Sequence, residues 1–257
     1  MINTSMKKKL VLKIGTSTLT AQTERISHGK IEDIARQILA LKNEYNIVLV
    51  SSGAIAAARQ FIAVNKWGAE IRSKQAMAAI GQPLLMQIYN EIFNDFGLKA
   101  AQCLMTYRDF ENAASRKNTR TTIDMLLLHD YIPIINENDT VSTEEIVLGD
   151  NDKLSALVAA LIDADLLVLA TDTYGLFDKD PHAHADARFI KEVTDLNVIA
   201  RYAEEKKSKL GTGGMASKLH AAAICKENDI EMWIINAQNK NFLTNAMKEK
   251  TLFTKFT

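Results

Sequence analysis

The chain has 257 residues, of which 47% are hydrophobic and 24% charged, so it holds enough apolar material for a sizeable core beneath a charged surface. Its 31 Lys and Arg residues balance its 31 Asp and Glu residues, which excludes the basic excess of a general nucleic-acid binder. Three prolines and 11 glycines exclude a long Pro-rich linker. Nearly all of the chain should therefore fold, as one large domain or two intimate ones.

The two cysteines, Cys103 and Cys225, lie in apolar stretches and cannot form a disulfide framework, which favours a reducing compartment. The apolar run at residues 10–14 is short and is interrupted by Lys13, so it is typical of neither a signal peptide nor a membrane span. We expect a cytoplasmic protein with no membrane partner and no nucleic-acid partner.

Six short runs rich in Val, Ile and Leu predict buried strands, because they do not alternate apolar with polar residues. Longer segments of helical period separate these runs. The alternation predicts an α/β fold with a mostly parallel sheet that is covered on both faces. The predicted strands are residues 10–14, 47–50, 100–105, 132–135, 166–170 and 232–235.

Apolar stripes with helical spacing predict helices between these strands. The segment 73–96 also has a helical period, but Pro83 follows Gly81 closely and should kink or restart the helix, so we expect two helices there. The other predicted helices are residues 31–41, 111–128, 154–162 and 216–226.

Polar groups follow the carboxyl ends of four predicted strands, where open α/β sheets bind their ligands. Each group by itself fits an ordinary turn, because turns favour Gly, Ser, Asn and Asp. Their joint occurrence indicates a ligand site at this edge of the sheet. The groups are KIGTS at 13–17, SSGA at 51–54, NEND at 136–139 and TD at 171–172.

A glycine-rich loop, GTGGM at 211–215, precedes the last predicted helix, and Lys218 lies about one turn inside that helix. Glycines let a backbone approach a ligand closely, and the free N–H groups of a helix start attract anions, so phosphate is the expected ligand. The spacing is neither that of a P-loop nor that of a dinucleotide fingerprint. A plain flexible loop before a helix is the alternative interpretation.

Lys13 interrupts a strand that otherwise reads as buried. A buried ammonium is costly unless it meets an anion, so this lysine indicates an anion at the strand end. A solvent-facing strand end is the alternative. Lys13 and Lys218, each beside a glycine-containing loop, could neutralise the charge that develops on a transferring phosphoryl group.

The sequence GDNDK at 149–153 opens a predicted helix. Asp or Asn at a helix start is commonly a cap. Here Asp150 and Asp152 flank Asn151 and supply more carboxylate than a cap requires. One of them could orient the lysines or a Mg²⁺ ion on a nucleotide.

The five histidines, His28, His129, His182, His184 and His220, coincide with none of these motifs, and no pair has the spacing of a metal site. This pattern disfavours a zinc site and a histidine general base. The lack of a histidine base is consistent with a carboxylate as the phosphoryl acceptor. A Glu side chain, with a reference pKa of about 4.3, is already ionised at neutral pH and needs no base.

Further motifs are SGAIA at 52–56, SKQ at 73–75, AIGQ at 79–82 and GDND at 149–152. With these and the groups above, the chain resembles the amino acid kinase family from Lys9 to about Phe253, and most closely its glutamate-phosphorylating branch. The combination of SGAIA with SKQ is specific to that branch, whereas GTGGM is shared more loosely. Ser51 stands where Thr is commoner, a change that keeps the hydroxyl.

The resemblance implies MgATP-dependent phosphorylation of the L-glutamate side-chain carboxylate to an acyl phosphate, the first step of proline biosynthesis. It implies that Ser52, Asp139 and Asn151 contact glutamate. It also implies that Gly53 lets the substrate approach the backbone.

The resemblance further implies that Lys13 and Lys218 stabilise the transition state and that Asp152 holds both lysines in place. ATP and Mg²⁺ are the implied cofactors. No metal ligand is assigned, although Asp150 is a candidate near the Mg²⁺ of the nucleotide. The implied nucleotide-binding residues are Lys13, Thr171, Asp172, Thr212, Gly213, Gly214, Met215 and Lys218.

The fold implied by the resemblance is a three-layer αβα sandwich forming one kinase domain over 1–257. Residues up to about 165 would form the amino-acid lobe, and about 166–257 the nucleotide lobe. A homodimer or homotetramer and feedback inhibition by proline are also implied. The chain stops at Thr257, where the C-terminal PUA domain of many relatives would begin, so we expect no PUA domain.

Two alternatives remain. One is another specificity in the same family, for acetylglutamate, aspartate, carbamate or a nucleoside monophosphate. The other is a catalytically silent amino-acid sensor, against which the presence of Lys13, Lys218 and Asp152 argues.

Overall fold

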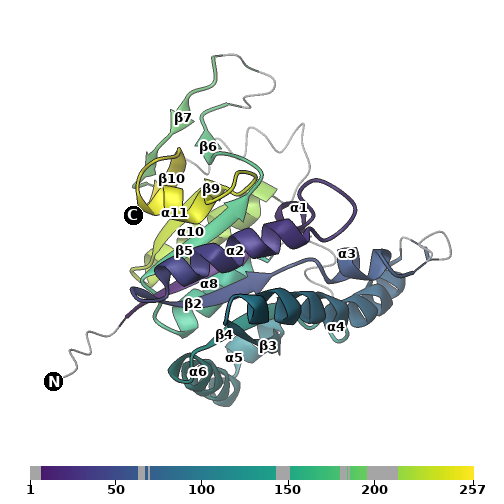
Figure 1. Ribbon diagram of the computed structural model, residues 1–257. Coiled ribbons are helices and arrows are strands. Elements are labelled where there is room, and N and C mark those ends of the chain that lie inside the picture. The colour runs from purple at the N-terminus through teal and green to yellow at the C-terminus, as the bar shows by residue number, and fades with distance from the viewer. Residues whose placement is uncertain are drawn as a thin grey trace.

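A central eight-stranded sheet lies between two layers of helices (Figure 1). The structure, a computed structural model, describes residues 7–62, 67–68, 70–142, 151–179, 184, 186–195 and 214–257. The helices α2, α4 and α11 cover one face of the sheet, and α6, α8 and α10 cover the other. The predicted three-layer αβα class is therefore confirmed.

The strand order in the sheet is β3-β4-β2-β1-β5-β9-β10-β8. All neighbours that include β1 to β5 are parallel, and only the β9–β10 pair is antiparallel. The strands are β1 (Lys8–Ile14), β2 (Tyr45–Ser51), β3 (Lys99–Met105), β4 (Tyr131–Glu137), β5 (Leu166–Thr171), β8 (Glu192–Val193), β9 (Glu231–Asn236) and β10 (Phe253–Phe256), with β6 (Leu176–Phe177) and β7 (Phe189–Ile190) forming a separate hairpin.

All six predicted strands are present, each extended by one to three residues beyond the apolar run that predicts it. The expectation that both faces of every strand are covered is wrong for β3, because this edge strand is mostly exposed or half-buried. The strands β6, β7, β8 and β10 were not predicted, since runs of two to four residues are too short to show a period.

The predicted helices are also present, but the two helices expected around Pro83 are one. The helix α4 runs unbroken through this proline for 25 residues. A proline removes one backbone hydrogen bond, and here α4 packs along α3, α2 and β3, so tertiary contacts override the local signal. The helices are α1 (Thr16–Leu19), α2 (His28–Leu41), α3 (Ala54–Arg59), α4 (Ile71–Asp95), α5 (Tyr107–Glu111), α6 (Ala113–Leu128), α8 (Asp152–Leu161), α10 (Gly214–Glu227) and α11 (Phe242–Met247).

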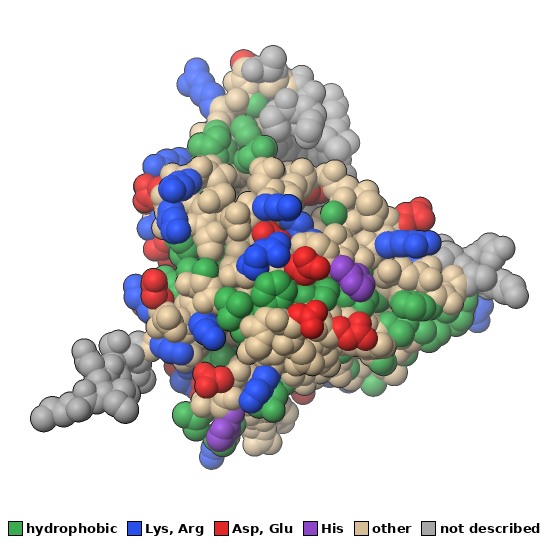
Figure 2. Space-filling view, viewed as in Figure 1, with side chains coloured by type: hydrophobic (Ala, Val, Ile, Leu, Met, Phe, Trp, Pro, Cys, Tyr) green, Lys and Arg blue, Asp and Glu red, His purple; other side chains and the backbone are tan. Residues whose placement is uncertain are grey.

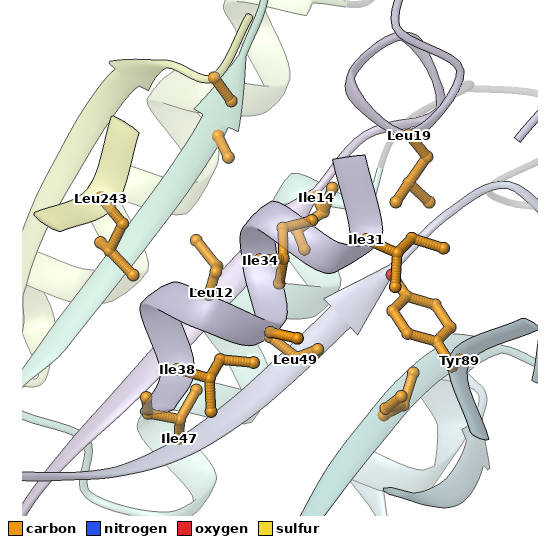
Figure 3. Close-up of a cluster of buried hydrophobic side chains, with 14 of the residues drawn as sticks. Leu12, Ile14, Leu19, Ile31, Ile34, Ile38, Ile47, Leu49, Tyr89 and Leu243 are labelled. Atoms are coloured by element: carbon orange, nitrogen blue, oxygen red, sulfur yellow. The ribbon is translucent and has the colours of Figure 1, made fainter. Parts of the chain in front are cut away.

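Two hydrophobic cores, one on each face of the sheet, follow from the alternation of side chains along the strands. In β1, Leu10, Leu12 and Ile14 join the core beneath α2, whereas Val11 joins the core beneath α8 and α10. Figure 3 shows the isoleucines of α2 directed onto β1 and β2. Strand parity therefore decides which helix layer each strand residue meets.

Charged side chains are interspersed on the molecular face seen in Figure 2, with neither sign gathered over one element. This agrees with the balanced composition. Within the described residues, no helix is both long enough and apolar enough to cross a bilayer. Cys103 and Cys225 are free thiols, and burial raises the pKa of both, that of Cys225 to about 12.

A glycine lets two helices meet backbone to backbone next to the predicted ligand edge. A Cβ atom on Gly81 of α4 would lie 1.8 Å from the carbonyl oxygen of Ala54 and 2.8 Å from the amide nitrogen of Ala58, both in α3. No side chain fits at that distance. Gly81 therefore sets how closely α4 approaches α3.

We predict that Gly81→Ala lowers the free energy of unfolding by at least about 2 kcal/mol, because a buried overpacked contact with backbone cannot be relieved by a rotamer change. Gly29→Ala is the matched control, since a Cβ on that exposed helical glycine meets no atom within 4 Å; its helix propensity gain should raise stability by up to about 1 kcal/mol. Chemical denaturation measures both. Equal stability of the two variants would contradict the close α3–α4 contact.

Candidate active site

The four polar groups predicted to share one edge of the sheet do lie there, at the carboxyl ends of β1, β2, β4 and β5. The strand β1 is central: Lys13 pairs in register with Val50 of β2 on one side and with Leu169 of β5 on the other. The chain builds β2, β3 and β4 on one side of β1 and β5, β9 and β10 on the other. Open α/β sheets bind ligands where the strand order reverses in this way.

The alternation of side chains along β1 directs Lys13 toward the helices α8 and α10. Lys13 is two residues from Val11, so it lies on the same face as that valine, and its neighbours there are the starts of α8 and α10. Only 6% of Lys13 is exposed. A buried ammonium requires an anion, and α8 supplies one at its first residue.

Asp152 bridges two lysines from different elements. Its Oδ1 atom lies 2.7 Å from Nζ of Lys13, and its Oδ2 atom lies 2.9 Å from Nζ of Lys218 on α10. Asp152 is fully buried, and both lysine side chains are largely buried. The Lys218 contact is a charge-assisted hydrogen bond and the Lys13 contact an ion pair, and the low dielectric strengthens both. Within this bridge two ammonium groups share one carboxylate, and cations held in this way suit an anionic ligand.

A second, uncharged cluster surrounds Asn151, the N-cap of α8. Its Nδ2 atom donates to Ser52 Oγ over 3.0 Å and to Asn136 Oδ1 over 2.9 Å. Asn151 is fully buried and Ser52 is 4% exposed. Both hydrogens of the Asn151 amide are thus used, while its Oδ1 atom is buried with no hydrogen-bond partner among the described residues.

Ser51 and Ser52 point to opposite faces of the sheet. The Ser51 hydroxyl lies 2.9 Å from Tyr89 of α4, which is also fully buried, whereas Ser52 meets Asn151 of α8. Burial raises the pKa of the Tyr89 phenol, so this residue stays neutral. Tyr89 in turn packs edge-on against Phe93, with ring centroids 5.4 Å apart. The contact between Ser51 and Tyr89 of α4 therefore holds the end of β2 in place, and this positions Ser52 at the site.

Gly53 has a backbone role. Its φ of +108° lies in the left-handed region, which a glycine adopts at no steric cost, and it forms the N-cap of α3. A Cβ at this position would lie 3.1 Å from a methyl group of Leu19 and 3.4 Å from one of Ile26. The turn that ends β2 and starts α3 therefore requires glycine for reasons within the fold itself.

Asp139 is a buried carboxylate with an unusual acidity. Loss of solvation, and then repulsion from Glu137, raise the pKa of Asp139 to about 7. Its backbone carbonyl accepts a bond of 2.9 Å from Gln75 on α4. Its Oδ1 atom is buried with no hydrogen-bond partner in the described part of the chain. Asn151 and Asp139 thus each present a buried acceptor oxygen of the kind that a cationic donor satisfies.

The predicted nucleotide residues are only partly within the described structure. Thr171 ends β5 and its hydroxyl donates to the carbonyl of Thr173, while the carbonyl of Asp172 accepts from Asn236 at the end of β9. The loops after β5 and β9 therefore lie together. Gly214 and Met215 form the first residues of α10, but Asp150, Thr212 and Gly213 lie outside the described residues.

The sequence analysis assigned no individual role to four buried residues that connect with this site, namely Gln82, Tyr89, Asn136 and Glu137. Gln82 and Asn136 lie within the AIGQ and NEND motifs, so position in a motif was the available signal. Nothing in the sequence marked Tyr89, because a tyrosine on an amphipathic helix is usually an ordinary core residue.

The chain belongs to the amino acid kinase family, whose sequence model matches residues 8–236. Among curated relatives it is 42% identical over 250 residues to a glutamate 5-kinase of Caldanaerobacter subterraneus subsp. tengcongensis, covering 96% of this chain and 67% of that protein. It is 41% identical to a glutamate 5-kinase of Symbiobacterium thermophilum, covering 97% of this chain and 95% of that protein.

Solved structures share the fold at low sequence identity. A UMP kinase from Ureaplasma parvum superposes with a TM-score of 0.66 at 19% identity, covering 98% of this chain and 99% of that one. A carbamate kinase from Giardia lamblia bound to AMP-PNP gives 0.68 at 16% identity, again covering 98% and 99%. These similarities support the fold.

We predict that Asp152→Ala destabilises the protein by about 3–5 kcal/mol, because two largely buried lysines lose their shared anion. The control is Glu32→Ala on α2, whose pair with Arg36 is exposed and should contribute no more than about 0.5 kcal/mol. Thermal or urea unfolding measures both. A loss for Asp152→Ala as small as that of the control would contradict the buried bridge.

Proposed function

We propose that this chain transfers the γ-phosphoryl group of ATP to the side-chain carboxylate of L-glutamate, forming L-glutamyl 5-phosphate in the first step of proline biosynthesis. The observation that carries the proposal is the pairing of a cationic Lys13–Asp152–Lys218 bridge with an adjacent acceptor-rich cluster around Asn151. Curated glutamate 5-kinases at 41–42% identity support the same activity.

The reaction needs positioning and charge neutralisation more than acid–base chemistry. A glutamate carboxylate oxygen forms a bond to the γ-phosphorus while the bond from that phosphorus to the β,γ-bridging oxygen breaks, and ADP leaves with the electron pair. The carboxylate is already ionised at neutral pH, so no proton has to be removed. Lys13 and Lys218 neutralise the oxygens of the transferring group, and Asp152 keeps both ammonium groups aimed at it.

The acceptor-rich cluster suits an α-amino acid. Asn151 Oδ1 and Asp139 Oδ1 would accept hydrogen bonds from the substrate ammonium. Ser52 Oγ already accepts from Asn151, so its own hydrogen is available for a substrate carboxylate oxygen. Gly53 serves this cluster by fixing the turn that presents Ser52.

The nucleotide would lie over the ends of β5 and β9, against Thr171 and Asp172. The residues 212–215 would wrap its phosphates at the start of α10, where free N–H groups favour anions. Magnesium would arrive bound to the phosphates of ATP. Asp150 is the candidate residue that would lie near this ion. Within the described residues no cluster of three acidic, His or Cys side chains could hold a metal ion.

We also propose, on the family resemblance, that proline competes with glutamate for the same cluster, that the chain forms a homodimer or homotetramer, and that it works in the cytoplasm. The amino-acid lobe would correspond to residues up to about 165, and the nucleotide lobe to the rest. One continuous sheet runs through both lobes.

The proposed substrate is tested by trapping the product. With MgATP and hydroxylamine, the purified chain should form a hydroxamate from L-glutamate, because that nucleophile captures an acyl phosphate. Aspartate should react at least about 100-fold more slowly, because its side chain is one bond of about 1.5 Å shorter and a misplacement of about 1 Å already costs that much. N-acetylglutamate should fail, since it lacks the cation that Asp139 is proposed to bind.

Preference for aspartate, N-acetylglutamate or carbamate would replace the named substrate and leave the kinase activity intact. Glutamate binding without ATP turnover would instead support the sensor. Lys218→Ala is the internal control, because it should lower kcat by about 100-fold or more while glutamate still binds.

A pH profile tests Asp139 as the ammonium-binding group. Because its pKa is raised to about 7, the carboxylate is protonated in acid and binds the substrate ammonium only above that value. We expect kcat/KM for glutamate to rise with pH between about 5.5 and 8 and then level off. Asp139→Asn should give a low kcat/KM without this rise, and any titration of ATP itself remains in the variant. The same rise in both proteins would refute the assignment.

A further inference from the structure

A chain of buried amides runs from the proposed substrate cluster into α4. Gln82 Oε1 accepts from Asn136 Nδ2 over 3.0 Å, and Gln82 Nε2 donates to Gln102 Oε1 of β3 over 2.9 Å. Asn136 Oδ1 accepts from Asn151 Nδ2 over 2.9 Å. Gln82, Asn136 and Asn151 are 7%, 1% and 0% exposed, so water does not compete for these bonds.

A backbone N–H at one end of the Asn136 amide and Gln82 at the other together set the direction of the bonds in this relay. The N–H of Glu137 can only donate, and it donates to Asn136 Oδ1 over 2.9 Å. The other end of the Asn136 amide must therefore be its NH₂ group, which needs an acceptor. Gln82 Oε1 supplies that acceptor.

The orientation of Asn136 then decides what Asn151 offers to a ligand. Since Asn136 presents an oxygen, Asn151 must turn its NH₂ group toward Asn136 and Ser52, which leaves Asn151 Oδ1 as a buried acceptor without a partner in the described chain. If Asn136 rotated, Asn151 would rotate with it. The cluster would then present a donor in place of an acceptor, and it would no longer suit a substrate ammonium.

We propose that Gln82 is a positioning residue that locks the Asn136–Asn151 relay and thereby makes the site select ligands with a cationic amino group. This inference rests on the proposed glutamate kinase activity. Gln82 does not touch the substrate in this scheme; it acts through Asn136.

The backbone of Gln82 is held in place independently of its side chain. It follows Gly81, where α4 meets the backbone of α3, so the amide of Gln82 approaches Asn136 from a fixed point. At its other end the relay reaches Gln102, which is exposed. A water molecule can replace Gln102 but not Gln82, because only the former is open to solvent.

Three variants separate positioning from packing. Gln82→Met keeps the side-chain volume and removes both bonds. Gln82→Glu keeps the acceptor for Asn136 Nδ2, while the exposed Gln102 amide can turn to donate. Gln102→Met removes only the replaceable outer bond.

Gln82→Met should raise KM for glutamate on the order of 10-fold, with kcat and KM for ATP within about twofold of wild type. Gln82→Glu should restore most of the loss, and Gln102→Met should stay near wild type. Glutarate, which is glutamate without its amino group, adds a specificity measurement. The ratio of its inhibition constant to KM for glutamate should fall about 10-fold in Gln82→Met.

A lower melting temperature with an unchanged ratio would overturn the proposal, because packing alone does not alter selection for an ammonium. Loss of activity in Gln82→Glu equal to that in Gln82→Met would overturn it too. Should Gln82→Met fail to fold, Gln82→Ala provides the same comparison, because water can enter without fixing the direction of the amide.

The relay is also measurable without turnover. In the ligand-free protein, the side-chain NH₂ signals of Asn151, assigned from their absence in Asn151→Ser, should shift in spectra of ¹⁵N-labelled Gln82→Met and stay in place in Gln102→Met. A wild-type chain that makes no hydroxamate from glutamate would overturn the proposed function, and the NMR comparison would still decide the positioning role. Unmoved Asn151 signals in Gln82→Met would refute the relay.

Discussion

The site depends on one buried carboxylate that two lysines share. Asp152 has no exposed surface, and it connects the central strand β1 with the starts of α8 and α10 through Lys13 and Lys218. Removing three charges from water is costly unless they satisfy one another. Each element therefore has to lie where the bridge requires it. The bridge therefore holds two ammonium groups in fixed positions, and in the proposed reaction a phosphoryl group in transfer would meet them without reorganisation.

The alternation of side chains along each strand decides which residues lie on the same face of the sheet as that bridge. Each polar residue at or near a strand end is committed to one face of the sheet: Lys13 and Ser52 to the α8 side, Ser51 and Asn136 to the α4 side. The charged bridge lies on the α8 side alone. The amide relay crosses from one side to the other at the contact between Asn136 and Asn151. The sheet edge thus holds the cationic bridge beside a set of amides whose hydrogen-bond direction determines what they offer to a ligand.

The positions of six strands were predictable because buried parallel strands are continuous apolar runs, and Lys13 stood out because it interrupts one. The continuity of α4 through Pro83 was not predictable, since it depends on packing along α2, α3 and β3. The amide relay was not predictable either. It depends on the close α3–α4 contact at Gly81, and no spacing in the sequence shows which way an amide turns. The raised pKa of Asp139 has the same origin, because burial and Glu137 act only in the folded chain. The roles of all the proposed site residues stay predictions, and Thr212 and Gly213 also lie outside the described residues.

In the proposed reaction, the two regions, the cationic bridge and the amides beside it, would divide the work of a carboxylate kinase according to what each substrate group needs. Phosphate oxygens carry charge that changes during transfer, so they require cations that are already in place. The ammonium of an amino acid carries a charge that does not change, so it requires only acceptors at a fixed distance from those cations. Asn151 and Asp152 are adjacent at the start of α8, and one helix end therefore contributes to both regions. In the proposed reaction this adjacency would fix the distance from the bound ammonium to the phosphoryl group, and that distance would set the length of side chain that can react.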